Sequence, residues 1–295
     1  MKLVYSPKYE FDIGDHVFPT NKYRLIREYL LKEQLVVETD FVEPPTTDPD
    51  DIRLVHTMEY VDEMLKLRWT PRTVRSELPL TEEVIQGCFL HASGTILGCR
   101  LALQDGKCVH LGGGFHHASA DHAEGFCYVN DIAVGVAKML QEGKVRRAAV
   151  LDCDLHQGNG TARIFQNNPN VYTFSIHQEA LYPVKEQSSL DIGLENEVGD
   201  NEYLARLGDA VPQILDSFKP ELVVYQAGSD PYRLDRLGAL RLTMEGLVKR
   251  DKLLYDHARR RSIPIVAVLG GGYALDANDT VQIHSNLVKV FLEKL

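Results

Sequence analysis

The chain is organised around Val150-Leu151-Asp152-Cys153-Asp154-Leu155-His156-Gln157-Gly158-Asn159-Gly160. The stretch continues an apolar run that is typical of a buried strand. Strand side chains alternate between two faces, so Asp152, Asp154 and His156 would point to one side if the strand continued. Two carboxylates and an imidazole at a strand end indicate a metal site, although a plain turn with a capping Asp gives a similar pattern. Gly158 and Gly160 are expected to let the backbone turn tightly into the next helix.

Strand-like and helical segments alternate along the whole chain. Apolar, β-branched runs predict strands at residues 3–5, 109–111, 148–151, 171–176, 222–225 and 263–269. Amphipathic patterns predict helices at residues 22–31, 82–103, 131–141, 161–167, 202–218 and 243–260. This alternation predicts an α/β fold with a mainly parallel central sheet covered on both faces. No internal repeat or low-complexity linker divides the chain, so residues 1–295 are expected to form one domain.

The composition narrows the class of protein. The 295 residues are 44% hydrophobic, and the net charge of −10 argues against a nucleic-acid backbone as the main partner. The acidity is compatible with a cationic substrate, although solubility explains it equally well. No apolar run reaches about 18 residues and the N-terminus lacks a signal-peptide pattern, so no membrane partner is expected. The five scattered cysteines, without a C-x-x-C motif, predict reduced thiols and a cytoplasmic protein.

Polar residues follow five of the predicted strands. They occupy residues 112–117, 152–159, 175–177, 227–235 and 270–273. In open α/β sheets, sites form beyond the carboxyl ends of parallel strands. These five loops are therefore expected to converge on one edge of the sheet.

The loops contain several side chains suited to catalysis. His116 and His117 follow three glycines and suggest an acid/base pair, or else a glycine turn with incidental histidines. Asp230 and Asp235 are candidates for a further metal ligand, or else turn and capping residues. Tyr273 closes a second glycine-rich loop, either as an oxyanion donor or as a half-buried aromatic.

Together these motifs make the sequence resemble the zinc-dependent histone deacetylase superfamily, from about Tyr5 to Leu287. The resemblance is carried by Gly113-Gly114-Phe115-His116-His117-Ala118, Gly125-Phe126-Cys127-Tyr128-Val129-Asn130-Asp131, Asp152 to Gly160, Asp235-Arg236-Leu237-Gly238 and Gly270-Gly271-Gly272-Tyr273. The short chain, His-Gln-Gly-Asn-Gly and Asp-Arg-Leu-Gly look most like class IV enzymes and bacterial deacetylase-like amidohydrolases. The resemblance implies the three-layer arginase/deacetylase-like fold and a single catalytic domain.

The resemblance also implies metal sites. It makes Asp154, His156 and Asp235 the zinc ligands, with Asp230 in a supporting position. A potassium site is implied at Asp152, Asp154, His156, Ser175 and Ile176, partly through backbone carbonyls. A second potassium site would use the carbonyls of Phe165, Asn168 and Val171.

The same resemblance assigns catalytic roles. His117 looks like the base that activates the attacking water and then the acid that protonates the leaving amine. His116, paired with Asp152, looks like the electrostatic partner, and Tyr273 would bind the carbonyl oxygen. Substrate-binding positions are implied at Gly125, Phe126, Tyr182 and Gly271. Asn159 would lie behind His117 where many members have Asp, and Gln157 stands where many have His.

The expected function is zinc-dependent removal of acetyl or longer acyl groups from lysine side chains of proteins or peptides. An acetylpolyamine amidohydrolase acting on a small acylated amine is the first alternative. An arginase-like binuclear manganese hydrolase would want an Asp two residues after the metal His, where this chain has Gly158. A non-enzymatic binding module on a hydrolase fold is the third alternative. The oligomeric state and the preferred acyl length stay open.

Overall fold

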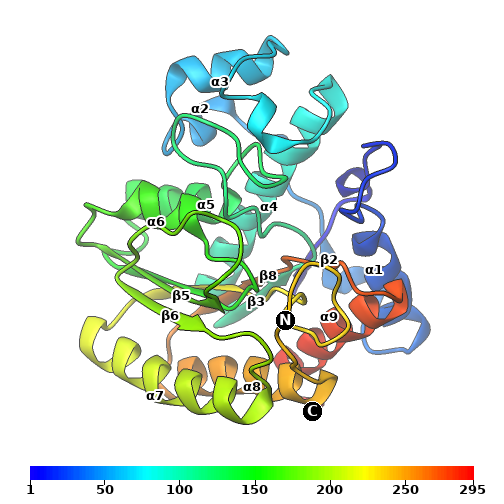
Figure 1. The fold of residues 1–295 in the computed structure, drawn as a ribbon, viewed down its shortest axis with the longest axis vertical. Helices are drawn as coiled ribbons and strands as arrows, with labels where there is room; N and C mark the ends of the chain where they lie inside the picture. Colours follow the sequence, from blue (N-terminus) through cyan, green and yellow to red (C-terminus); the bar gives the residue numbers. More distant parts are fainter.

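A single eight-stranded sheet forms the centre of the molecule in a computed structural model that describes residues 1–295 (Figure 1). The strand order is β2-β1-β3-β8-β7-β4-β5-β6, and all neighbouring strands are parallel. The strands are β1 (Leu3–Val4), β2 (Phe41–Val42), β3 (Lys107–His110), β4 (Ala148–Asp152), β5 (Val171–Gln178), β6 (Leu190–Leu194), β7 (Leu222–Gln226) and β8 (Ile265–Val268).

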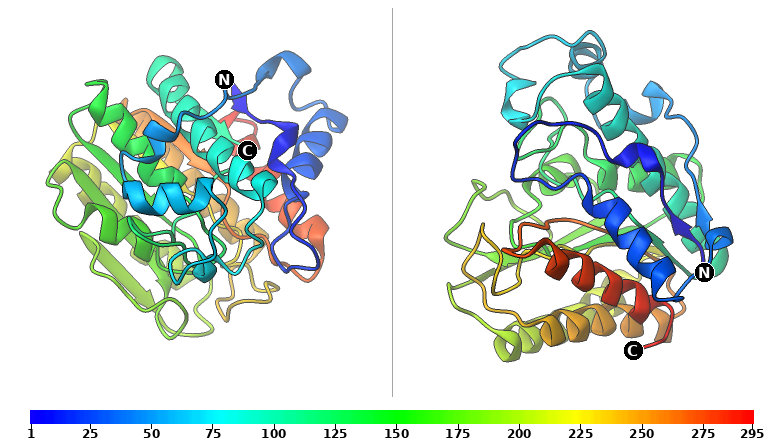
Figure 2. Two further views of the ribbon diagram at one scale, coloured as in Figure 1. Left: turned by 90° about the horizontal axis from the view of Figure 1, so that it is seen from above. Right: turned by 90° about the vertical axis from the view of Figure 1, so that its right-hand side faces the viewer.

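Nine α-helices flank the sheet and complete a three-layer α/β arrangement. They are α1 (Lys22–Lys32), α2 (Pro49–Ile52), α3 (Met58–Leu65), α4 (Glu82–Asp105), α5 (Asp131–Gln141), α6 (Asn159–Phe165), α7 (Asp200–Phe218), α8 (Met244–Arg260) and α9 (Ala277–Phe291). Helices α4, α5 and α6 lie on one face of the sheet, and α7, α8 and α9 on the other (Figures 1 and 2). None of the helices combines the length and the apolarity needed to cross a bilayer.

Burial on both faces explains the composition of the central strands. All residues of β4, β7 and β8 are buried, as expected for strands covered by helices on both sides. The surrounding core contains 83 buried hydrophobic residues. The helix ends follow local rules: Thr81 accepts a hydrogen bond from the Val84 amide at the start of α4, and Gly106 ends that helix in a left-handed conformation. The central strands are therefore held firmly, and their carboxyl ends provide a rigid platform.

The predicted elements differ from the observed ones in identifiable places. The six predicted strands are present with shifted ends, whereas β2 and β6 were not expected because β2 has two residues and β6 is a half-exposed edge strand. Helices α2, α3 and α9 were also not expected. The predicted turn at Gly160 is wrong, because Gly160 lies in the first turn of α6. A Cβ there would lie 2.4 Å from the carbonyl oxygens of His117 and Ala118, so Gly160 permits close packing.

Candidate active site

A cavity of about 290 Å³ opens at the carboxyl edge of the sheet, where the loops after β3, β4, β5, β7 and β8 meet. All four predicted substrate-binding residues line it. The lining also includes His116, His117, Asp154, His156, Asp230 and Tyr273. Asp235 is not among the lining residues.

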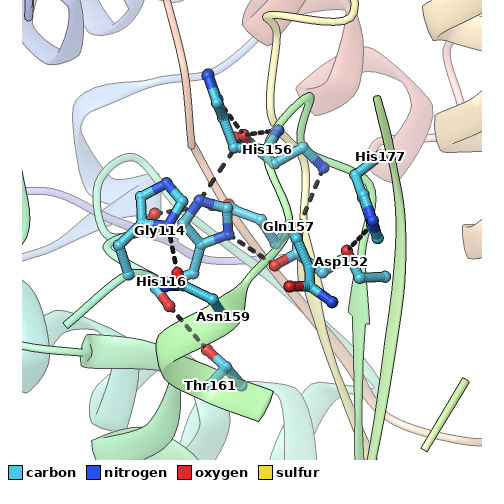
Figure 3. Close-up of polar contacts among 12 residues, drawn as sticks. Gly114, His116, Asp152, His156, Gln157, Asn159, Thr161 and His177 are labelled. Atoms are coloured by element: carbon cyan, nitrogen blue, oxygen red, sulfur yellow. Dashed lines mark hydrogen bonds and ion pairs between the residues drawn. The ribbon is translucent and has the colours of Figure 1, made fainter. Parts of the chain in front are cut away.

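The two adjacent histidines have different partners. His116 Nδ1 donates to Asp152 Oδ2 at 2.7 Å, and Figure 3 shows these two side chains facing each other. His117 Nδ1 donates to Asn159 Oδ1 at 2.7 Å. Carboxylate oxygens only accept hydrogen bonds, so His116 must carry its proton on Nδ1. One imidazole is therefore paired with a charge, and the other with a neutral amide.

These partners separate the acidities of the two histidines. Burial by itself lowers the pKa of His116, but Asp152 and Asp154 raise it to about 9. Burial and the charges of His116 and His156 lower the pKa of His117 well below its ordinary value. His116 is therefore an imidazolium at neutral pH, and His117 is a neutral imidazole that can accept a proton.

A buried group of possible metal donors lies next to the histidine pair. One donor atom each from Asp154, His156 and Asp230 lie within 4.8 Å of one another. His156 Nδ1 is 3.3 Å from both Asp154 Oδ1 and Asp230 Oδ2. Asp230 Oδ2 is buried and has no hydrogen-bond partner. Two carboxylates and an imidazole are a donor set that suits zinc.

Asp235, the expected third zinc ligand, lies outside this group. Its Oδ1 accepts from the Leu237 amide at 2.9 Å and its Oδ2 from the Tyr273 amide at 3.1 Å. Each oxygen of its carboxylate is therefore hydrogen-bonded to a backbone amide. Burial and the charge of Asp230 raise the pKa of Asp235 to about 8. The distances between donor atoms thus favour Asp230 as the third zinc ligand, whereas the sequence motif favours Asp235.

The residues expected for potassium lie on β4, β5 and the loop after β4. Asp152 and Ser175 are direct neighbours in the β4–β5 register, and Ile176 follows on β5. Ser175 Oγ lies 2.9 Å from His177 Nδ1. The second expected set occupies the end of α6 and the start of β5. There, the carbonyl oxygens of Phe165 and Asn168 accept hydrogen bonds from backbone amides.

A tight turn shapes one wall of the cavity. Gly125 and Phe126 both have positive φ values, +51° and +64°, and the Cys127 amide donates to the Glu124 carbonyl at 2.9 Å. This is the pattern of a type I′ turn. A Cβ at Gly125 would lie 2.6 Å from the Tyr182 hydroxyl and 2.7 Å from His117 Cδ2, so only glycine leaves the passage open.

Aromatic rings complete the passage. The ring of Phe126 lies 6.2 Å from that of Tyr273, and the ring of Tyr182 lies 5.3 Å from that of His117. Burial and nearby carboxylates raise the pKa of Tyr273 well above its ordinary value, so its hydroxyl keeps its proton. The cavity therefore places a phenol donor and apolar walls beside the histidines.

Sequence reasoning missed the residues that hold the glycine-rich loops. Asp131 accepts from the amides of Gly114 at 3.2 Å and Phe115 at 2.7 Å, and so fixes the backbone before His116. Lys22 donates to the carbonyls of Leu269 and Gly271, next to Tyr273. Asp131 ends the Gly125–Asp131 motif, so the sequence did contain a signal for it. Lys22 lies in an amphipathic helix where a lysine is normally exposed, so no signal marked it.

Gln157 does not take part in the histidine arrangement. Its side chain donates to the Glu186 carbonyl at 2.7 Å and to Asp191 Oδ1 at 2.8 Å, and it accepts from the Glu186 amide. It therefore holds the loop before β6 instead of contacting His117. Of the two positions where this chain differs from many family members, Gln157 and Asn159, it is Asn159 that contacts a candidate catalytic residue.

Comparisons with known proteins agree with this arrangement. Residues 16–288 match the model of the histone deacetylase domain. The chain is 38% identical to an uncharacterized protein of Picosynechococcus, over 97% of this chain and 96% of that protein. It is 31% identical to a probable deacetylase of Methanothermobacter thermautotrophicus, over 94% of this chain and 87% of the relative. Histone deacetylase 2 of Arabidopsis thaliana is 29% identical over 92% and 74% of the two chains. With its parallel sheet, paired histidines and domain match, the chain belongs to the histone deacetylase family.

Proposed function

We propose that this protein is a zinc-dependent amidohydrolase that removes acetyl or longer acyl groups from lysine side chains. Membership of the histone deacetylase family implies a hydrolytic deacetylase. The observation that carries the finer proposal is the pairing of His116 with the Asp152 carboxylate and of His117 with the Asn159 amide, in one cavity with Tyr273 and the buried donor group. We further propose that residues 1–295 act as one catalytic domain.

Zinc would be held by Asp154, His156 and Asp235, with Asp230 beside them. Bound there, zinc would polarise the amide carbonyl and make hydroxide available near neutral pH. Potassium would be held near Asp152 and Ser175. A buried Asp230 oxygen that accepts no hydrogen bond, within the group formed with Asp154 and His156, supports a zinc ion there.

The protein's own side chains would manage the protons. His117 donates from Nδ1 to Asn159, so Nε2 is free to take a proton from the attacking water. The same proton can then pass to the amine as the carbon–nitrogen bond breaks. The positive charge on His116 and the Tyr273 hydroxyl would stabilise the negative charge that develops on the carbonyl oxygen.

The walls of the cavity support a lysine substrate. Phe18, Phe126, Tyr182 and Leu237 line it, and an aliphatic stem can pack against such surfaces. A carboxylate in the lining, Glu77, favours a second candidate: an acylated polyamine with further cationic nitrogens. A cytoplasmic location is part of the proposal and is supported by five unpaired cysteine thiols.

A hydrolysis panel tests the proposal. Acetyl-, butyryl- and long-chain acyl-lysine peptides and acetylated polyamines would be compared by kcat/KM with zinc-loaded protein. We expect the acyl-lysine peptides to be the better substrates. Turnover confined to polyamines would establish the second candidate, and no turnover of any amide by fully zinc-loaded protein would rule out both.

A further inference from the structure

Glu124 lies at the centre of a hydrogen-bonded group behind the catalytic histidine. Its Oε1 accepts from Asn159 Nδ2 and from the Tyr182 hydroxyl, both at 3.3 Å. Its Oε2 lies 3.4 Å from His122 Nε2 and 3.4 Å from an Arg75 guanidinium nitrogen. The side chain is 14% exposed, so these contacts are largely shielded from water. Glu124 is therefore connected to His117 through a single intervening side chain.

Glu124 is ionised where it lies. Burial opposes ionisation, but His122 and Arg75 lower the pKa of Glu124 below its ordinary value. An ionised carboxylate has no proton to donate. The group on Asn159 that faces Glu124 must therefore be its NH₂, and its carbonyl oxygen must face His117.

This orientation determines the tautomer of His117. Asn159 Oδ1 can only accept, so His117 Nδ1 carries the proton and Nε2 keeps its lone pair. An Asn159 amide turned by about 180° would present its NH₂ to Nδ1. It would thereby favour the opposite tautomer, in which Nε2 is protonated and cannot act as a base.

We infer that Glu124 is a positioning residue that selects, through Asn159, the His117 tautomer with a free Nε2. The inference rests on the proposed function of His117 as base. Asn159 transmits the orientation, while the negative charge stays one residue away from the imidazole. A carboxylate at position 159 would accept from His117 by itself and would need no orienting partner.

A double-mutant cycle tests this role on zinc-loaded enzyme. Glu124→Ala should lower kcat by roughly 10–100-fold, the usual loss when a partner that orients a catalytic imidazole is removed. Glu124→Gln should lose less, because its amide oxygen can still accept from Asn159. Together with Asn159→Asp, Glu124→Gln should instead raise kcat above that of Asn159→Asp alone, because it removes repulsion between two neighbouring carboxylates.

Two comparisons separate positioning from a structural role. If Glu124 only holds the 124–127 turn and Tyr182, its substitution should lower kcat equally in both backgrounds, and that result would overturn the inference. Arg75→Ala is the matched control, because it removes one contact to Oε2 and leaves the contact to Asn159. We expect it to keep kcat within about twofold, because the Arg75 side chain is half-exposed and such pairs contribute little.

The tautomer can also be observed without any substrate. Nitrogen-15 NMR of histidine-labelled, zinc-loaded protein, with His117→Ala to assign the signals, reports which ring nitrogen carries the proton. We expect Nδ1–H in the wild type and loss of this preference in Glu124→Ala. An unchanged Nδ1–H tautomer in Glu124→Ala would refute the inference. Because this measurement needs no turnover, it remains decisive even if the proposed amidohydrolase activity fails.

Discussion

His116 and His117 are neighbours in the chain, with ring centroids 4.1 Å apart, yet they hold protons very differently. The difference arises from the groups behind them, a carboxylate for His116 and an amide for His117. Two titratable groups whose surroundings push their pKa values apart are suited to opposite roles in one reaction. Two histidines can thus act differently, His116 as a positive charge and His117 as a proton acceptor.

Tyr273 allows a clean test of oxyanion stabilisation. Tyr273→Phe keeps the ring that packs near Phe126 and Phe18, so the fold and zinc content should be unchanged. We expect kcat to fall by roughly 10²–10³, the usual loss for one donor to an oxyanion. Steady-state kinetics with an acyl-lysine peptide provide the measurement, and a rate close to wild type would remove Tyr273 from the mechanism.

The two aspartates after β7 offer a test of the metal assignment. We expect Asp235→Ala to abolish tight zinc binding, because the sequence motif makes it a ligand. Asp230→Ala should retain zinc but lose stability or activity, because Asp230 Oδ1 accepts from the Leu155 amide at 3.0 Å. Zinc content after dialysis, measured by elemental analysis, distinguishes them. Zinc retained by the first variant and lost by the second would make Asp230 the ligand, as the distances between donor atoms favour.

For individual residues, sequence motifs identified the reactive side chains but missed the residues that hold the site loops in place. His116, His117 and Tyr273 lie in short glycine-rich motifs that can be read locally. Glu124 and Lys22 act on loops far away in the chain, since Glu124 contacts Asn159 and Lys22 contacts the 269–271 segment. Such contacts depend on tertiary packing, which no local pattern contains.

Among the elements, helix α8 supports two site loops at once. Arg250 is fully buried on this helix and donates to the carbonyls of Cys153 at 3.1 Å and Gly228 at 2.6 Å. Its guanidinium also pairs with Asp251, whose carboxylate accepts from the Tyr225 hydroxyl. One side chain therefore links the loop after β4 to the loop after β7.

Replacing Arg250 should damage both stability and metal binding. Arg250→Met leaves Asp251 as a buried charge with no cation, so we expect a loss of about 3–5 kcal/mol in the free energy of unfolding. Zinc affinity should fall roughly 10–100-fold because the ligand loops lose their support. Urea unfolding and zinc titration measure these effects. Arg259→Met, on the exposed side of α8, should change stability by less than about 1 kcal/mol.

The sequence predicted elements well where burial was continuous. The six apolar runs became strands of the parallel sheet, because strands covered on both faces need hydrophobic side chains throughout. Strand β6 has alternating exposure, and β2 is too short for a recognisable period. Both are edge strands, whose place depends on pairing with a neighbour.

Across the whole molecule, several histidines are buried in neutral form. His56 is one of them: Nδ1 donates to the Ser119 carbonyl at 2.9 Å, and Nε2 accepts from the Asn130 amide at 3.0 Å. A second proton would displace the Asn130 amide. Burial lowers the pKa of His56 to about 4 and that of His110 to about 3. The fold thus excludes protons that the unfolded chain would bind.

This exclusion predicts destabilisation in mild acid. In the unfolded chain a histidine has a pKa near 6.5. The stabilisation gained by keeping His56 neutral is therefore complete above that pH, and this part of the free energy of unfolding is lost as the pH falls toward about 4. The slope is at most about 1.4 kcal/mol per pH unit for one such group. Urea unfolding at several pH values should show a shallower slope for His56→Gln than for wild type. Equal slopes for wild type and His56→Gln would mean that His56 does not take up a proton on unfolding. The control is His257→Gln, which replaces a histidine at a partly exposed position.

Strand β8 lies between β3 and β7, although it is the last strand in the chain. The strands β2-β1-β3 and β7-β4-β5-β6 therefore have no pairing with each other until Ile265–Val268 has been synthesised. Until that strand has been added, β3 and β7 each expose an unpaired edge, the kind of surface that can pair with another chain. The histidines after β3 and the metal donors after β4 and β7 are then on separate half-sheets. The site can thus be assembled only late in translation, after the final strand has joined the two half-sheets and Tyr273 has been added behind it.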